Sequence, residues 1–236
     1  MELEESMIRE VENNELEQGD AAEAKALEPE RVEVPGVGEV LVGGCPFEVE
    51  DQLDDHQGDN FLNAGGDCGV VSVVNIARLF GVNCTEDDAI LKAVQNRLCE
   101  YSTANDAADN GGTSYLNRQA LLAEYGISTT AFEGKRLSPE QIARLAEAGH
   151  LVNLSANAGY LWGDPDYIDD GSSNHSVVVT GSARDPETHE LVGLFICDSG
   201  VPGKSSAVFV PVDVLDRAYT RAPGSTALVT DRPMSA

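Results

Sequence analysis

The chain has 236 residues, of which 42% are hydrophobic, and it carries a formal charge of −26. This length allows one substantial core, so we expect one domain, with or without a tail. So negative a field repels phosphate groups, which argues against a nucleic acid or an anionic membrane as a partner. No apolar run approaches the ~20 residues of a membrane helix, and no secretory signal opens the sequence. We therefore expect a cytoplasmic protein, with export by a route that needs no such signal as the alternative.

The negative charge is concentrated near the amino terminus. Residues 1–60 contain nineteen acidic and three basic residues, whereas the other 176 contain twenty-two and twelve. We predict that residues 1–44 form an acidic arm that is flexible or loosely ordered, and that the compact domain spans residues 45–236. A solvated tail is the simplest interpretation. The alternatives are a salt-adapted surface, a mimic of an anionic ligand, or a dock for a basic partner.

Four segments have helix signals. After Cys68 the chain is apolar on nearly all sides up to Gly81, which predicts a buried central helix. A second helix, over 85–98, opens with a capping box, and a third is expected over 114–126. The fourth, over 138–149, has the clearest limits, because it shows a serine cap, a proline in the first turn and a closing glycine.

Strand signals follow the helices. They are short, apolar and rich in β-branched residues, and they occur at 151–156, 175–181, 191–198, 206–212 and 226–230. Helices that precede antiparallel strands in this way predict an α+β fold.

The number and spacing of the cysteines argue against disulfide bonds and against a zinc site. The five cysteines are odd in number, and neither a Cys-x-x-Cys pair nor a His-Glu-x-x-His motif occurs. These patterns disfavour a disulfide framework and a zinc site. No metal or other cofactor is expected.

Cys68 stands at the start of the predicted central helix, in NAGGDCGVV, rather than within its apolar pattern. Unpaired N–H groups and the helix dipole lower the pKa of a thiol there and favour the thiolate. The same N–H groups can hold the oxyanion that forms when a thiolate attacks a carbonyl. We predict that Cys68 is a nucleophile, with a small core residue as the alternative.

A thiol nucleophile needs a base, and of the four histidines only His175 opens a strongly apolar strand. The turn DPET, residues 185–188, fits type I. A hairpin centred there pairs residues whose numbers sum to 373, so Val177 faces Ile196 and His175 faces Asp198 on the same side of the sheet. The carboxylate can then orient the imidazole ring. A slip of one residue would move it to the opposite side.

The segments GDCGVVSVVNIARLFG and NHSVVVTGSARDPETHELVGLFICDSG resemble the nucleophile helix and the histidine–aspartate hairpin of papain-like cysteine peptidases. They are particularly similar to the peptidases that trim double-glycine leader peptides, and to papain-like domains of bacterial polymorphic toxins. The resemblance covers roughly residues 55–215 in element order. It implies a papain-like α+β fold, whose N-terminal helical part packs its buried nucleophile helix on a C-terminal antiparallel sheet. By this likeness Cys68 matches the nucleophile, His175 the base and Asp198 the orienting residue.

The resemblance also implies an oxyanion donor. These families place a glutamine shortly before the cysteine, and here Leu62 occupies the corresponding position, so the chain departs from the pattern. Gln57, Asn60 and Asn63 are the candidates. Gln57 is preferred on chemical type, because the glycines before Cys68 permit a loop that brings it back.

The function implied by the resemblance is amide-bond cleavage in a protein or peptide substrate, without a cofactor. One alternative is deamidation or transglutamination by the same residues, as in a toxin-like effector. Another is an inactive papain-like binding domain. Because the leader-trimming relatives cut after two glycines, self-processing at Gly44 is a further hypothesis, and a flexible turn is its alternative.

Overall fold

The computed structural model describes residues 30–53, 55–133 and 137–234. Within these residues, helices and an antiparallel sheet of eight strands form an α+β fold. The α-helices are α2 (Cys68–Leu79), α3 (Glu86–Gln95), α4 (Tyr115–Glu124), α5 (Pro139–Glu147), α6 (Ala158–Trp162) and α7 (Val212–Leu215). Shorter turns are η1 (Glu50–Gln52), η2 (Ala107–Asp109), η3 (Pro165–Tyr167) and the π-helical η4 (Asp216–Thr220). The strands are β1 (Glu30–Val34), β2 (Gly38–Gly44), β3 (Thr129–Phe132), β4 (Val152–Ala156), β5 (His175–Arg184), β6 (Leu191–Cys197), β7 (Val208–Pro211) and β8 (Ala227–Thr230).

Strand β5 is the centre of the sheet. Along one edge it pairs first with β4 and then with β2, and along the other edge it pairs with β6. The strands follow the order β1-β2-β5-β4-β8-β3, in which neighbours are hydrogen-bonded. Strand β6 lies outside this order and pairs with both β5 and β7. Because β5 and β6 are antiparallel, the start of β5 at His175 and the end of β6 before Asp198 lie at the same end of the sheet.

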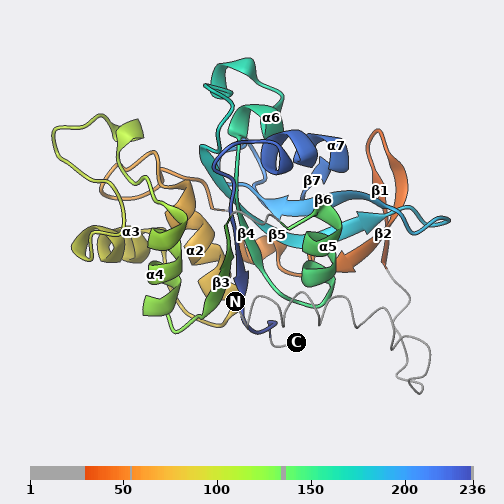
Figure 1. The fold of residues 1–236 in the computed structure, drawn as a ribbon. Helices are drawn as coiled ribbons and strands as arrows, with labels where there is room; N and C mark the ends of the chain where they lie inside the picture. Colours follow the sequence, from red (N-terminus) through yellow and green to blue (C-terminus); the bar gives the residue numbers. More distant parts are fainter. Residues whose placement is uncertain (1–29, 54, 134–136, 235–236) are drawn as a thin grey trace.

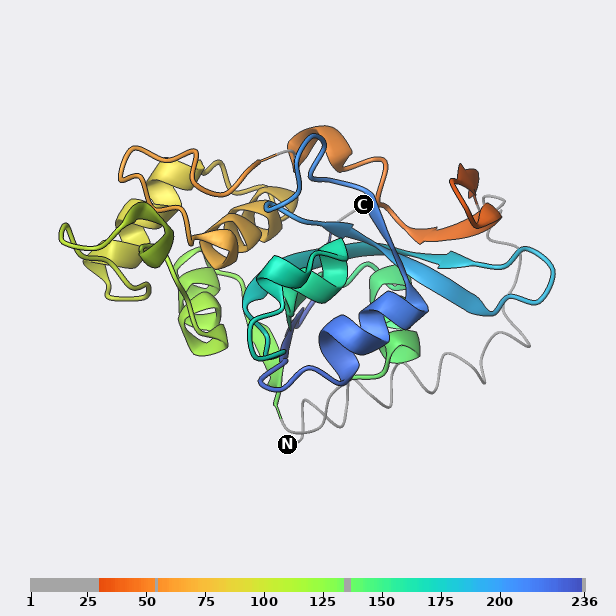
Figure 2. The same ribbon diagram turned by 90° about the horizontal axis from the view of Figure 1, so that it is seen from above.

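Different helices cover the two faces of the sheet (Figures 1 and 2). Helices α2, α3 and α4 share an apolar core with Val178 of β5 and Cys197 of β6. Helix α5 and the segment from α7 through η4 pack with Val177 and Val179 in a second core. Alternation along β5 sends these neighbouring valines to opposite faces, as the two-residue period of a strand requires.

The folded part starts before the boundary predicted at residue 45. Residues 30–44 form the β1–β2 hairpin, and β2 pairs with β5. Buried valines of the hairpin pack with Ala183 and Phe195, so alternating apolar positions hold this segment on the sheet. Gly44 lies within β2 and not in a flexible turn. The rest of the expected arm, residues 1–29, lies outside the described residues.

The helix limits agree with the sequence signals. Helix α2 begins at Cys68, and the chain turns after it at Gly81, which has a φ of 79°. Thr85 caps α3 and Ser138 caps α5, each in a capping box with the residue three positions on. The five expected strands are found as β4 to β8, whereas β3, with only four residues, had no clear signal.

The β5–β6 register differs by two residues from the prediction. Val179 lies opposite Ile196, so near the start of β5 paired numbers sum to 375 instead of 373. Irregularities after Val179 and after Ala183 change this sum to 376 for the pairs between them. The connecting loop is longer than the four-residue turn, because His189 adopts a left-handed φ of 59° and extends it. Because the shift is two at the start of β5, His175, Val177 and Val179 stay on the face of Ile196 and Asp198. His175 and Asp198 are therefore diagonal neighbours and not a directly opposed pair.

Candidate active site

Cys68, the first residue of α2, is partly buried. The loop before it is tied down at Gly65 and Gly66, whose N–H groups each donate to a carbonyl within residues 107–110 at 2.8 Å. A Cβ atom at Gly66 would come within 2.6 Å of the Ala108 carbonyl oxygen, so glycine is needed for this close approach. The tied loop and the buried helix together fix the direction of the Cys68 side chain.

His175 and Asp198 are joined by a hydrogen bond of 2.6 Å from Nε2 to Oδ1. Both side chains are almost fully buried, at 3% and 1% exposure. The N–H of Gly200 donates to the same carboxylate oxygen at 2.9 Å, and the indole of Trp162 donates to the other oxygen at 2.8 Å. With Nε2 occupied, Nδ1 is the ring nitrogen left for the Cys68 thiol, whose charge acts on the pKa of the ring.

The pKa of the Cys68 thiol is lowered from its ordinary value. Burial alone would raise it, but the positive charge of His175 and its hydrogen bond outweigh burial. The charge of Arg118 and a backbone hydrogen bond from Ser176 act in the same direction. The nucleophilic thiolate is therefore favoured at this position.

The pKa values of His175 and Asp198 are shifted in the directions that favour their charged forms. Burial alone would lower the pKa of His175, but the Cys68 thiolate and Asp198 raise it to about 10. Burial would raise the pKa of Asp198, and the hydrogen bonds from His175, Trp162 and Gly200 bring it below its usual value. These shifts together favour a thiolate–imidazolium pair backed by an ionised carboxylate.

The remaining thiols lack such an environment. Burial raises the pKa of Cys45, Cys84 and Cys99, in the last case to about 11. Cys197 lies in the core shared with α2, as strand alternation predicts for it. Only Cys68 combines partial exposure with a lowered pKa among these residues.

Trp162 covers the His175–Asp198 pair. Its ring packs edge to face with His175, with centroids 5.1 Å apart, and with Tyr167 at 4.9 Å. A Cβ atom at Gly200 would come within 2.5 Å of the indole, so glycine lets the ring approach the imidazole. Trp162 thus combines packing contacts with a hydrogen bond to the carboxylate.

The three candidate oxyanion donors lie in different places. Asn63 is exposed, and Asn60 uses its amide within its own loop and on two carboxyl groups. Gln57 donates from Nε2 to the Gly65 carbonyl at 3.0 Å, and its Oε1 accepts from the Ser199 hydroxyl at 3.4 Å. Gln57 thus links the loop before the thiol to the segment after the carboxylate. None of the three is among the described residues that line the cavity beside the thiol.

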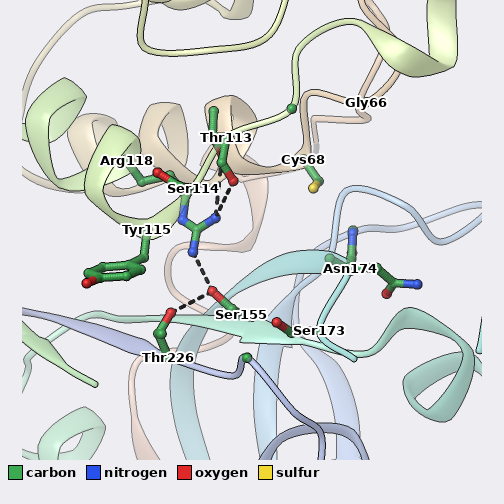
Figure 3. A pocket seen from close by; sticks show the side chains of 13 residues that line it. Gly66, Cys68, Thr113, Ser114, Tyr115, Arg118, Ser155, Ser173, Asn174 and Thr226 are labelled. Atoms are coloured by element: carbon green, nitrogen blue, oxygen red, sulfur yellow. Dashed lines mark hydrogen bonds between the residues drawn. The ribbon is translucent and has the colours of Figure 1, made fainter. Parts of the chain in front are cut away.

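A cavity of about 320 Å³ opens beside Cys68 and His175 (Figure 3). Residues 112–115 and α4 line one side of it, and β4 and the segments leading into β5 and β8 line the other. Six of the lining residues carry a hydroxyl group and one is an arginine, Arg118. No aspartate or glutamate occurs among the described lining residues, although the whole chain is strongly acidic.

Arg118 is 4% exposed and is held by neutral groups. Its Nε donates to Asn153 Oδ1 at 2.8 Å, Nη2 donates to Ser155 Oγ at 2.5 Å, and Nη1 donates to the Thr113 carbonyl at 3.3 Å. Burial lowers the pKa of Arg118 to about 10, and the Cys68 thiolate opposes that effect. The guanidinium is therefore still charged at neutral pH.

Asp67, directly before Cys68, is fully buried and interacts with Glu86. Burial, the charge of Glu86 and a hydrogen bond between the two carboxyl groups raise the pKa of Asp67 to about 9. Asn60 donates to both groups, at 3.2 and 2.9 Å, and the N–H of Gly58 donates to Asp67 at 3.0 Å. Asp67 is thus neutral at pH 7 and does not oppose the thiolate.

Sequence reasoning missed the roles of Arg118 and of the Asp67–Glu86 pair. A signal for Arg118 was available, because it lies three and four positions before the buried Leu121 and Leu122 and so on the buried face of α4. No local pattern pairs Asp67 with Glu86, since they come from separate helix starts. Among the described residues, no group of three or more His, Cys, Asp or Glu side chains is placed to bind a metal ion.

Comparisons with known proteins do not assign a family. No family model matches the sequence, and no curated protein matches it. One similar solved structure is the crystal structure of a double glycine motif protease from an AMS/PCAT transporter in complex with the leader peptide. It shares 18% identity over 70% of this chain and 84% of that chain, with a TM-score of 0.44. At this level the likeness assigns no activity here. Within the described ranges, no helix is both long and apolar enough to cross a membrane.

Proposed function

We propose that this chain is a papain-like cysteine hydrolase that cleaves amide bonds of a protein or peptide substrate. The observation that carries the proposal is the position of His175 between Asp198, at 2.6 Å, and a Cys68 thiol whose pKa is lowered. An activated nucleophile, a base and an orienting group that meet beside a cavity suit acyl transfer.

The reaction follows from these contacts. The Cys68 thiolate attacks the amide carbonyl, and the backbone N–H of Cys68 holds the oxyanion. Gln57 is the second donor in this proposal, through the Nε2 hydrogen that the Gly65 carbonyl does not accept. The imidazolium of His175 gives its proton to the leaving amine, which leaves a thioester on the sulfur. His175 then takes a proton from water, whose hydroxide attacks the thioester and releases the acid and the thiolate. Asp198 keeps the ring oriented through both steps.

The test is cleavage of a diverse peptide library, read by mass spectrometry, with the wild type and Cys68→Ala. We expect the variant to lose cleavage by about 1,000-fold or more while its circular dichroism spectrum is unchanged. Cys99→Ala is the matched control, because that thiol is also partly buried but has a raised pKa. It should cleave like the wild type. Cleavage retained by Cys68→Ala would refute the assigned nucleophile.

The same assay separates the two alternatives. Ammonia release from glutamine without backbone cleavage, lost in Cys68→Ala, would identify a deamidase or a transglutaminase. If a thiol-directed probe labels Cys68 no faster than Cys99, the chain is a binding domain on this fold and the hydrolase proposal is wrong.

A further inference from the structure

The cavity beside Cys68 holds a cation that forms no ion pair with a carboxylate of the described residues. Arg118 is 4% exposed, and no ion pair joins it to a carboxylate in residues 30–53, 55–133 or 137–234. Buried charges in proteins are normally paired, because an unpaired one loses its hydration without compensation. The negative charge that acts on it is the thiolate of Cys68, which raises the pKa of Arg118 against the effect of burial.

The negative charge on Cys68 is lost during the proposed reaction. When the Cys68 sulfur forms a thioester it becomes neutral, and Arg118 then faces a cavity without carboxylates among its described lining residues. A negative group on the acyl part of the substrate would replace the lost charge at this step. Figure 3 shows the sulfur of Cys68 and the guanidinium of Arg118 both turned from the helical side towards the strand that carries Ser155.

Donors for such a group remain available. A guanidinium has five N–H bonds, and the contacts of Arg118 to Asn153, Ser155 and Thr113 leave at least one of them for a ligand. Ser155 Oγ accepts from Arg118 and is also 2.8 Å from Thr226 Oγ1. Whichever hydroxyl donates in that pair, one hydroxyl hydrogen is left over for the cavity. A carboxylate can accept from the remaining N–H of Arg118 and from this hydroxyl together.

We propose that Arg118, with the Ser155–Thr226 hydroxyl pair, binds a carboxylate of the substrate next to the amide that Cys68 attacks. Arg118 is then the residue that determines specificity, and the enzyme selects substrates with an acidic group at that position. This inference rests on the proposed hydrolase function for its substrate step, but the anion site itself can be tested without turnover. The carboxylate has two possible sources, an Asp or Glu side chain or the free carboxyl terminus of a peptide.

The first experiment compares alkylation of Cys68 by iodoacetate and by the neutral iodoacetamide, read by mass spectrometry of the Cys68 peptide. The ratio of the two rates cancels any change in the thiolate fraction, because both reagents need the same thiolate. We expect Arg118→Gln to lower the ratio by about 10-fold and Arg118→Lys, which keeps the charge, to lower it less. Arg217→Gln, at an exposed arginine paired with Asp213, is the control and should leave the ratio unchanged. An unchanged ratio in Arg118→Gln overturns the proposal.

A second measurement needs only the wild type, in case the Arg118 variants do not fold. N-acetylglutamate should slow labelling of Cys68 by iodoacetamide at concentrations where the isosteric N-acetylglutamine has no effect. Equal protection by the two compounds overturns the proposal, as does protection by neither.

The substrate experiment compares peptides with Glu or Gln, and Asp or Asn, on either side of the cleaved bond, each with a free or an amidated carboxyl terminus. Preference for Glu or Asp identifies a side chain as the source, and preference for the free terminus identifies an exopeptidase. Cleavage without either preference overturns the inference and leaves the hydrolase proposal intact. If no peptide is cleaved, the hydrolase proposal fails, and the alkylation ratio still decides whether the anion site exists.

Discussion

The indole Nε1 of Trp162 donates to Asp198 Oδ2 at 2.8 Å, while His175 occupies Oδ1 of the same carboxylate. The two bonds hold the carboxylate in one plane and so set the orientation of the imidazole. Trp162→Phe keeps an aromatic ring over His175 but removes the N–H. Because a hydrogen bond to a buried charged group is lost, we expect kcat/KM to fall by about 10-fold, mainly through kcat. Steady-state kinetics on a cleaved peptide would measure this.

The control for Trp162→Phe is Tyr167→Phe. Tyr167 packs against the indole but is exposed, so loss of its hydroxyl should change neither kcat nor KM. A Trp162→Phe enzyme with the kcat and pH profile of the wild type would show that the indole only fills space.

Asp198→Asn tests the carboxylate itself. Burial lowers the pKa of His175, and the Cys68 thiolate and Asp198 together more than offset it, so removing one charge should move the pKa of His175 downwards. The imidazolium that protonates the leaving amine would then be lost at lower pH, and the alkaline limb of kcat/KM should shift in the acid direction. We also expect kcat/KM at neutral pH to drop by about 100-fold. Asp213→Asn, at an exposed carboxylate, is the control, and an alkaline limb in Asp198→Asn identical to that of the wild type would contradict the assignment.

The pH dependence of labelling tests the thiolate–imidazolium pair in the unaltered protein. The lowered pKa of Cys68 predicts that iodoacetamide labels it with a midpoint below 9.0, whereas Cys99, with a pKa of about 11, is labelled only in strong alkali. For catalysis, kcat/KM should rise as Cys68 ionises and fall near pH 10 as His175 loses its proton. Parallel labelling of Cys68 and Cys99 across the pH range would exclude the pair.

Much of this fold could be predicted from the sequence, because helix caps and strand alternation depend on residues that are close together in the chain. Capping at Thr85 and Ser138 depends on contacts three residues apart, and it sets the starts of α3 and α5 in sequence and structure alike. The juxtaposition of His175 with Asp198 was also predicted, from strand alternation across a single hairpin. The error of two residues in register left it intact, because an even shift preserves the face.

The features that could not be predicted from the sequence depend on contacts between segments that are distant in the chain. The place of β1 and β2 on the sheet rests on their packing against Ala183 and Phe195, and the acidic composition around them indicated an arm. Arg118 approaches the Cys68 site only because α4 packs beside α2, and Trp162 reaches Asp198 from the end of α6. These contacts are set by tertiary packing, which the periodicity within a single segment does not predict.

The buried carboxyl pair behind the nucleophile predicts a pH-dependent stability. The pKa of Asp67 is about 9 in the folded chain, against an ordinary value of 3.8, so the folded state holds a proton that the unfolded chain releases. Stability from this group is complete below about pH 4 and is lost as the pH rises towards about 9. Asp67→Asn mimics the neutral carboxyl and needs no proton. We therefore expect its free energy of unfolding, relative to the wild type, to gain up to about 1.4 kcal/mol per pH unit over this window.

Urea unfolding of both proteins at several pH values from about 5 to 9 measures this difference. Asp88→Asn is the control, since hydrogen bonds to Thr85 lower the pKa of that exposed carboxyl, and its difference from the wild type should stay flat over the same range. The neutral state of Asp67 also keeps a negative charge away from Cys68, so Asp67→Asn should leave thiol labelling at neutral pH unchanged. A flat stability difference for Asp67→Asn, or slower labelling of Cys68, would mean that Asp67 is ionised in the folded protein. The thiolate would then have to form beside a buried negative charge.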